Sequence, residues 1–271
     1  MSRIERIDCH VHTWYSGHGE GAVEEVASAG AGLSLTTLAF TEHLTLPASL
    51  DSDGRVSMTS DQVDSYRRDI ETARARHPQM EIICGTEVDW LGAPRPDLVE
   101  AARGFEYVLG SVHYLDGWAF DDPDLAERWE RCDVDAVWRR YVEVWCEAVE
   151  SPYPFTCMSH PDLPKKFGHR PSFDTHDLFG QMAQTVAERG LMVEVNSAGL
   201  RKPVGELYPS DELLAAFCDA GVECTFGSDA HTPSLVGYGY EQARAALLRA
   251  GYRFVTVPQR DGGRRHISLE G

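Results

Sequence analysis

The sequence has little that would suit a nucleic-acid-binding, membrane-spanning or disulfide-stabilised protein. Acidic residues outnumber basic ones by 43 to 25, which gives a formal net charge of -18 and disfavours binding to phosphate backbones. No apolar run approaches the ~20 residues that a membrane span needs, and the first residues lack the apolar core of a secretion signal. The cysteine count of 7 is odd and includes no CxxC pair. We therefore expect reduced, buried thiols in a cytoplasmic protein.

What the chain does contain is an alternation of short apolar runs and amphipathic stretches. The apolar runs that predict strands are residues 4–9, 37–41, 81–86, 107–112, 155–159, 191–196, 222–227 and 253–257. The stretches that predict helices include residues 60–76, 133–150, 174–189, 211–220 and 242–250. This alternation predicts a mostly parallel sheet, and seven or eight such units favour a closed barrel. We expect one domain over residues 1–271, with surface excursions at 46–59 and at the acid-rich segment 115–130.

Imidazole and carboxylate side chains follow six of the predicted strands. They are His10 and His12 after the first, His43, Glu87, His113 and His160 after the next four, and Asp229 with His231 after the seventh. Because the C-terminal ends of barrel strands face one rim, these side chains should meet there. Residues two apart in an extended chain point to the same side. The two residues of the first pair can therefore bind the same ion, and so can the two residues of the last pair.

A lone histidine at a strand end is more often a structural residue than a ligand. Six strand ends with the same bias are different, because histidines and acids clustered without a metal would cost desolvation energy. Imidazole and carboxylate together suit zinc, manganese or iron. Eight such groups exceed what one ion can use, so the sequence predicts two or three ions. His18, in the loop after the first strand, is available to a third set, whereas His169 and His176 stay open.

Basic residues concentrate on two loops that should lie at the same rim. The loop after the fifth strand carries Lys165, Lys166 and Arg170, and the loop after the sixth carries Arg201 and Lys202. Guanidinium and ammonium groups beside metal ions suit phosphoryl oxygens, so the two loops predict a phosphorylated substrate. Arg201 is the favoured contact. Lysine and arginine also populate loops for no specific purpose, and that alternative stands for some of the five.

The strand-end motifs occur in a recognisable order. The set HxH, TEH, GTE, SVH, SHPD and SDAH spans nearly the whole chain and resembles the PHP (polymerase and histidinol phosphatase) superfamily. The stretch NSAGLRKP, followed by YPS, resembles its histidinol phosphatase branch in particular. The resemblance implies a distorted (β/α)7 barrel, similar to a TIM barrel, with a trinuclear metal centre. It assigns the first ion to His10, His12, Glu87 and Asp229, the second to Glu87, His113 and His160, and the third to His18, His43 and His231.

The resemblance also implies an activity, the hydrolysis of L-histidinol phosphate to L-histidinol and phosphate in histidine biosynthesis. A metal-bound water, acidified toward neutrality, would be the nucleophile. The residues expected to take part in catalysis are Glu87, Asp229, His231 and Arg201, and those expected to bind the substrate are Arg201, Lys202, Lys165 and Arg170. The leaving-group proton could come from Asp229 or from a nearby histidine. Asp116, Asp121 and Asp122 are candidates for recognising the amine and imidazole of the substrate.

Three alternatives remain beside this hypothesis. A related PHP phosphatase or phosphodiesterase would use the same metals on another small phosphate ester, such as a nucleotide. A PHP nuclease or proofreading module is disfavoured by the net charge of -18 and by the lack of basic stripes interleaved with aromatic residues. A non-catalytic metal-binding protein on a decayed scaffold is disfavoured because the ligand set is complete. The oligomeric state is left open.

Overall fold

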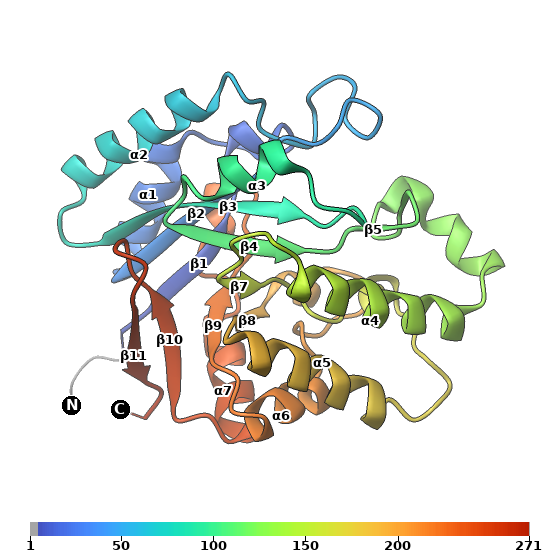
Figure 1. Ribbon diagram of the computed structural model, residues 1–271. Coiled ribbons are helices and arrows are strands. Elements are labelled where there is room, and N and C mark those ends of the chain that lie inside the picture. The colour runs from blue at the N-terminus through green and yellow to red at the C-terminus, as the bar shows by residue number, and fades with distance from the viewer. Residues whose placement is uncertain (1–4, 271) are drawn as a thin grey trace.

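The computed structural model describes residues 5–270, and a parallel sheet of seven strands lies at its centre (Figure 1). The strands are β1 (Ile7–Val11), β2 (Thr37–His43), β3 (Glu81–Asp89), β4 (Tyr107–Ser111), β7 (Cys157–Met158), β8 (Met192–Asn196) and β9 (Cys224–Gly227), hydrogen-bonded in that order. The chain after β9 returns to β1, where the His12 N–H donates to Ala230 O at 2.8 Å. The sheet is therefore nearly closed, which confirms the predicted barrel.

Helices cover the outside of the barrel (Figure 1). They are α1 (Val23–Gly32), α2 (Val63–Arg76), α3 (Pro96–Ala102), α4 (Val134–Glu150), α5 (His176–Arg189), α6 (Asp211–Asp219) and α7 (Tyr240–Ala250). The Asp133 side chain caps α4 by accepting from the Ala136 N–H, as its position before the apolar run suggests. The helices predicted to begin at residues 60 and 174 begin two or three residues later, because Gln62 and Asp174 close local turns with their side chains instead.

The last predicted strand run does not join the barrel. β10 (Phe254–Pro258) pairs antiparallel with β11 (Arg264–Ser268) in a separate two-stranded sheet. Figure 1 shows this hairpin on the side away from the arrowheads of β3 and β4. Arg265 on β11 donates to Thr37 Oγ1, at the start of β2, at 3.0 Å. The hairpin therefore lies at the N-terminal ends of the barrel strands and leaves the opposite rim free.

The acid-rich segment 115–130 is more regular than expected, whereas residues 46–59 form the expected turns and bends. The acid-rich segment includes most of the short hairpin of β5 (Tyr114–Leu115) and β6 (Trp118–Ala119), which is followed by the 3-10 helix η2 (Pro123–Arg131). Trp118, Phe120 and Trp129 are buried, and the Trp129 indole donates to Phe120 O at 2.7 Å. These aromatic contacts give the acidic loop a defined path, which polar composition alone did not indicate.

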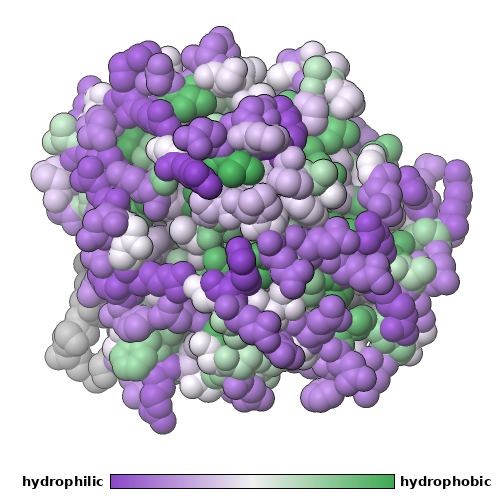
Figure 2. All heavy atoms as spheres, in the orientation of Figure 1, coloured by the Kyte–Doolittle hydropathy of each residue, from purple (hydrophilic) through white to green (hydrophobic). Residues whose placement is uncertain are grey.

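The helices, the hydrophilic surface and the cysteines are as the composition of the chain led us to expect. Across residues 5–270, the structure has no helix that is both long and apolar enough to span a membrane. Figure 2 shows a face on which hydrophilic residues predominate and apolar residues are scattered. All seven cysteines are free thiols, and all but Cys132 and Cys218 are buried.

Candidate metal centre

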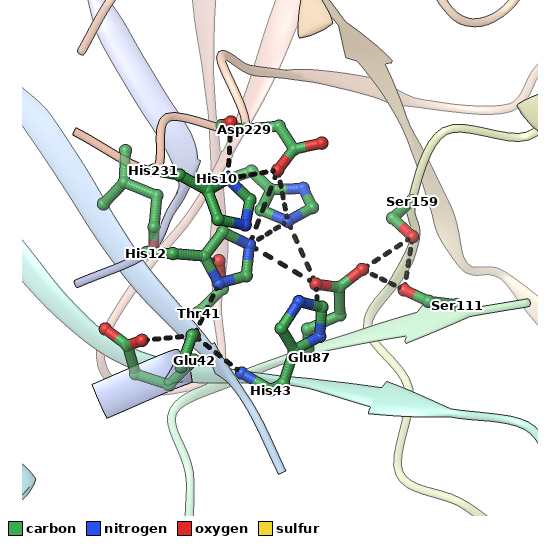
Figure 3. A network of polar contacts seen from close by, with 12 residues as sticks. His10, His12, Thr41, Glu42, His43, Glu87, Ser111, Ser159, Asp229 and His231 are labelled. Atoms are coloured by element: carbon green, nitrogen blue, oxygen red, sulfur yellow. Dashed lines mark hydrogen bonds and ion pairs between the residues drawn. The ribbon is translucent and has the colours of Figure 1, made fainter. Parts of the chain in front are cut away.

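The eight strand-end side chains meet at the C-terminal rim of the barrel, and Figure 3 shows most of them turned toward one another. Glu87, which is 1% exposed, lies at the centre of the group. Its Oε2 is 3.3 Å from His10 Nε2 and 3.4 Å from His12 Nε2, while the His43 ring nitrogen Nδ1 is 3.2 Å away. One carboxylate oxygen thus faces three histidines that come from β1 and β2.

The second oxygen of Glu87 faces a different pair of histidines. Glu87 Oε1 lies 3.2 Å from His160 Nε2 and 3.7 Å from His113 Nε2. These two imidazoles follow β7 and β4, on the other side of the carboxylate. Glu87 therefore has the placement of a bridging ligand, with one oxygen toward each group of histidines.

Asp229, His231 and His18 complete the arrangement at its more exposed edge. Asp229 Oδ1 is 3.6 Å from His12 Nε2 and 3.4 Å from His231 Nδ1. The His18 ring centroid lies 4.6 Å from that of His231 and 5.4 Å from that of His43. The structure thus brings all nine sequence-predicted ligands to one rim.

The hydrogen bonds at the far side of each ring test whether these residues suit a metal. The Nδ1 atoms of His10 and His113 lie 2.7 Å from carboxylate oxygens of Glu194 and Asp89, so each Nδ1 carries a proton and donates it. Ser16 donates to Glu42, which leaves the Ser16 oxygen to accept from His12 Nδ1 at 3.0 Å. The ring nitrogen that is left to bind an ion in each of these histidines is therefore Nε2.

The Nε2 atoms of neighbouring rings face one another. His10 Nε2 lies 3.0 Å from His12 Nε2, and His113 Nε2 lies 3.2 Å from His160 Nε2. Two ring nitrogens at this distance need either a proton or a metal cation between them. Ligand atoms also gather within 4.8 Å of one another in three overlapping groups, which are His12 with His43 and His231, His10 with His12 and Glu87, and His43 with Glu87 and His113. The donor set fits divalent transition metals with nitrogen and oxygen ligands.

The pKa shifts describe carboxylates that stay ionised among closely packed imidazoles. Burial opposes ionisation of Glu87, but the imidazoles of His43 and His10 hold its pKa well below the usual value. Burial also disfavours the charged form of His10, yet Glu194 and Glu87 raise its pKa well above the usual value. His12, in contrast, has its pKa lowered by burial and by His231, so it is a neutral imidazole near pH 7. The carboxylates therefore stay ionised and attract positive charge.

Sequence reasoning did not identify the acids behind the ligands. Glu194, Glu42, Asp8 and Asp89 are all buried, and each lies in or next to a ligand-bearing strand. Burial raises the pKa of Asp8 to about 6 although it accepts hydrogen bonds from the N–H groups of Ser228 and Gly237. A signal for these residues was present, because an acid flanked by valines, as Glu194 is in MVEVN, must find buried partners.

Arg201 is a predicted phosphate contact that is hydrogen-bonded to the backbone of a predicted ligand. Its Nη2 donates to Ser228 O at 2.9 Å and to Asp229 O at 3.2 Å. Its Nη1 is buried and has no hydrogen-bond partner among residues 5–270. The guanidinium is thus fixed to the loop that carries a predicted ligand, with one nitrogen left to bind another group.

The other predicted cations separate into two kinds. Lys165 is fully buried, 2.8 Å from Asp162 Oδ2, and donates to Leu207 O, so it has no surface toward the rim. Arg170 pairs with Glu206 at 2.6 Å on the exposed surface.

Lys166 and Lys202 lie closer to the ligands. Lys166 Nζ is 3.0 Å from Asp121 Oδ2. Burial and the charge of Lys166 lower the pKa of Lys202, which places these two ammonium groups in one neighbourhood. The structure therefore replaces Lys165 with its neighbour Lys166 as the lysine of this loop that faces the site.

Comparison with known proteins matches the description "PHP domain" over residues 8–198. The chain belongs to the PHP domain family. This PHP protein is 34% identical to a "probable histidinol-phosphatase" of Deinococcus radiodurans, over 93% of this chain and 96% of that protein. It is 25% identical to the histidinol-phosphatase of Bacillus subtilis, over 88% of this chain and 98% of that protein. Its barrel matches a histidinol phosphate phosphatase of Lactococcus lactis, solved with zinc, L-histidinol and phosphate, with a TM-score of 0.74, 18% identity, and coverage of 95% and 98%.

Proposed function

We propose that this PHP protein is a metal-dependent phosphate monoesterase that hydrolyses L-histidinol phosphate to L-histidinol and phosphate. The observation that carries the proposal is the Glu87 carboxylate between two groups of histidine ring nitrogens, with Arg201 at the same rim. The names of the Deinococcus and Bacillus relatives, which match over most of their length, support the substrate. The ligands in the Lactococcus structure belong to the same substrate class.

Two or three zinc, manganese or iron ions would be held by the nine residues. The proposed sets are His10, His12, Glu87 and Asp229 for one ion, Glu87, His113 and His160 for a second, and His18, His43 and His231 for a third. His43 also lies within reach of Glu87 and His113, so it stands between the second and third sets. Bound ions supply positive charge to the phosphoryl oxygens and make a water molecule acidic enough to serve as nucleophile.

The phosphoryl group is assigned to Arg201, Lys166 and Lys202. Arg201 Nη1 has no hydrogen-bond partner among the described residues, so it can donate to an oxygen of the ester without losing an existing contact. The lowered pKa of Lys202 arises from burial and from the nearby charges of Lys166 and Arg201. Cations gathered in this way on a protein with a net charge of -18 favour an anionic substrate.

Asp121 is assigned to the cationic amine of the substrate. Burial opposes its ionisation, but Lys166 and His113 lower its pKa, so it is a carboxylate near pH 7. Its Oδ2 is engaged by Lys166, and its side chain is 21% exposed. When a phosphoryl group draws the ammonium of Lys166, this carboxylate becomes free to accept from the amine of the same substrate.

The leaving alkoxide needs a proton, and the pair Asp229 and His231 is assigned to relaying one from solvent, because the pKa of Asp229 lies well below its usual value and its carboxylate holds no proton of its own near pH 7. Asp229 Oδ1 and His231 Nδ1 are 3.4 Å apart, and their side chains are 18% and 28% exposed, more than those of the ligands deeper in the barrel. The group that donates this proton must reach both the ester oxygen and solvent. Of the proposed ligands, these two meet that requirement with a direct contact between them.

The experiment is a measurement of phosphate release by the metal-repleted protein. L-histidinol phosphate is compared with nucleoside monophosphates, p-nitrophenyl phosphate and a phosphodiester. We expect the highest kcat/KM for L-histidinol phosphate. A higher value for a nucleotide would transfer the proposal to the nucleotide, and no release from any ester by protein that holds its metals would refute a phosphatase.

A further inference from the structure

Glu194 on β8 contacts two of the proposed ligands from beneath the site. Its side chain is fully buried. Its Oε2 accepts from His10 Nδ1 at 2.7 Å, and its Oε1 accepts from the backbone N–H of His160 at 3.2 Å. Oε1 also accepts from the amide of Asn196, two residues along the same strand. One carboxylate thus joins strand β8 to ligands that follow β1 and β7.

Asn196 extends the same contact to a third ligand. Its amide nitrogen lies 3.4 Å from Asp229 Oδ2, and its Oδ1 accepts from the Ala198 N–H at 2.8 Å. Glu194 and Asn196 are two apart on a strand, so their side chains point to the same face of the sheet. Together they contact His10, His160 and Asp229, which come from three different parts of the rim.

Two of these ligands have a backbone conformation that needs such support. His160 has a φ of 23° and Asp229 a φ of 52°, and few residues other than glycine adopt positive values. Strained conformations of this kind persist where the surroundings hold them. The His160 N–H is held by Glu194, and the Asp229 N–H donates to His10 O at 2.8 Å.

Strand β9 passes close to Glu194 at Gly227. A Cβ atom at Gly227 on β9 would lie 2.6 Å from Glu194 Oε2 and 2.5 Å from His10 Cβ. The chain therefore has glycine at the point where β9 passes the contact between His10 and Glu194. This close approach fixes the carboxylate against the imidazole, and a larger residue at position 227 would have to separate them.

We propose that Glu194, together with Asn196, is a positioning residue that orients His10, His160 and Asp229 and keeps the proton of His10 on Nδ1. The inference rests on the proposed metal site. With the proton on Nδ1, the Nε2 lone pair of His10 faces Glu87 and His12, where an ion would bind. Without Glu194, the ring has no fixed tautomer and the His160 N–H has no acceptor.

Glu194→Gln tests the role of the carboxylate, because it keeps the shape of the side chain while it removes the negative charge and replaces one acceptor by a donor. The His160 N–H and the Asn196 amide both donate, so the single oxygen of glutamine must face them. The glutamine NH2 then faces His10 Nδ1, which has to accept. That moves the His10 proton to Nε2 and blocks the ligand atom.

The readout is zinc binding to the apoprotein, measured by chelator competition and elemental analysis, with the cobalt(II) absorption spectrum as a second signature. We expect E194Q to bind the first ion about 10- to 100-fold more weakly, with an altered cobalt spectrum, while its apoprotein unfolds at a temperature near that of wild type. The control is Thr225→Val, which removes a buried hydroxyl from the register partner of Glu194 on β9. It should bind zinc as wild type does.

The outcomes separate the two proposals. Wild-type protein that holds less than one ion per chain would refute the metal site itself. Zinc affinity and a cobalt spectrum unchanged in E194Q, with wild type loaded normally, would overturn only the role of Glu194. If E194Q does not fold, Glu194→Asp replaces it. The aspartate side chain is shorter by one methylene and cannot keep the contacts with both His10 and His160. A wild-type affinity for zinc in that variant would therefore overturn the inference equally.

Discussion

Replacing Arg201 by alanine should raise the KM for L-histidinol phosphate far more than it changes kcat. Arg201 Nη2 already donates hydrogen bonds to Ser228 O and Asp229 O, so we expect Nη1, which has no hydrogen-bond partner among the described residues, to donate to the phosphoryl group. One hydrogen bond from a charged donor contributes about 1.5–3 kcal/mol. At 1.4 kcal/mol for each factor of ten, KM should rise about 10- to 150-fold.

The assay is steady-state phosphate release at saturating metal, with metal content measured on the same samples. Arg201→Lys should give an intermediate KM, because an ammonium keeps the charge without the planar fork. Arg249→Ala is the matched control, since it removes an exposed guanidinium that pairs with Asp211 on the surface. A KM for Arg201→Ala that equals the KM of this control would refute the assignment of Arg201 and move the phosphate contact to Lys166 or Lys202.

Two further predictions concern residues around the rim. Lys165→Met should lower the free energy of unfolding by about 3–5 kcal/mol, because it leaves Asp162 buried without its cation, and it should leave the KM unchanged. Chemical denaturation together with steady-state kinetics checks this. A large change in KM at unchanged stability would contradict it. Asp121→Asn should raise the KM for L-histidinol phosphate but not for p-nitrophenyl phosphate, which has no amine; equal effects on both esters would show that Asp121 does not recognise the amine.

The convergence of the candidate metal-binding side chains could be predicted from the sequence because two regularities act together. Alternation along a strand puts His10 and His12 on one side, and the parallel order of a barrel puts all strand ends at one rim. Neither regularity depends on the details of packing. The sequence could therefore predict that these side chains meet, although His12 and Asp229 are far apart in the chain.

The residues behind the ligands could not be predicted in the same way. Glu194 and His10 are 184 positions apart, and their contact depends on the register of β8 and on the space that Gly227 leaves. Similarly, the sequence could not say which of Lys165 and Lys166 faces the site. Consecutive residues of a 3-10 helix point about 120° apart. Lys165 points into the core, where it pairs with Asp162, and Lys166 therefore points elsewhere. The order of segment 115–130 comes from aromatic contacts that its acidic composition concealed.

The central claim is a polynuclear metal centre bridged by Glu87, and elemental analysis of metal-repleted wild type and Glu87→Gln tests it most directly. The contacts of both Glu87 oxygens with histidines predict two or three transition-metal ions per chain in wild type. They predict fewer ions and no phosphate release in Glu87→Gln, at a similar unfolding temperature of the apoproteins. Less than one ion per chain in repleted wild type, or full metal content and near-normal turnover in Glu87→Gln, would contradict the account.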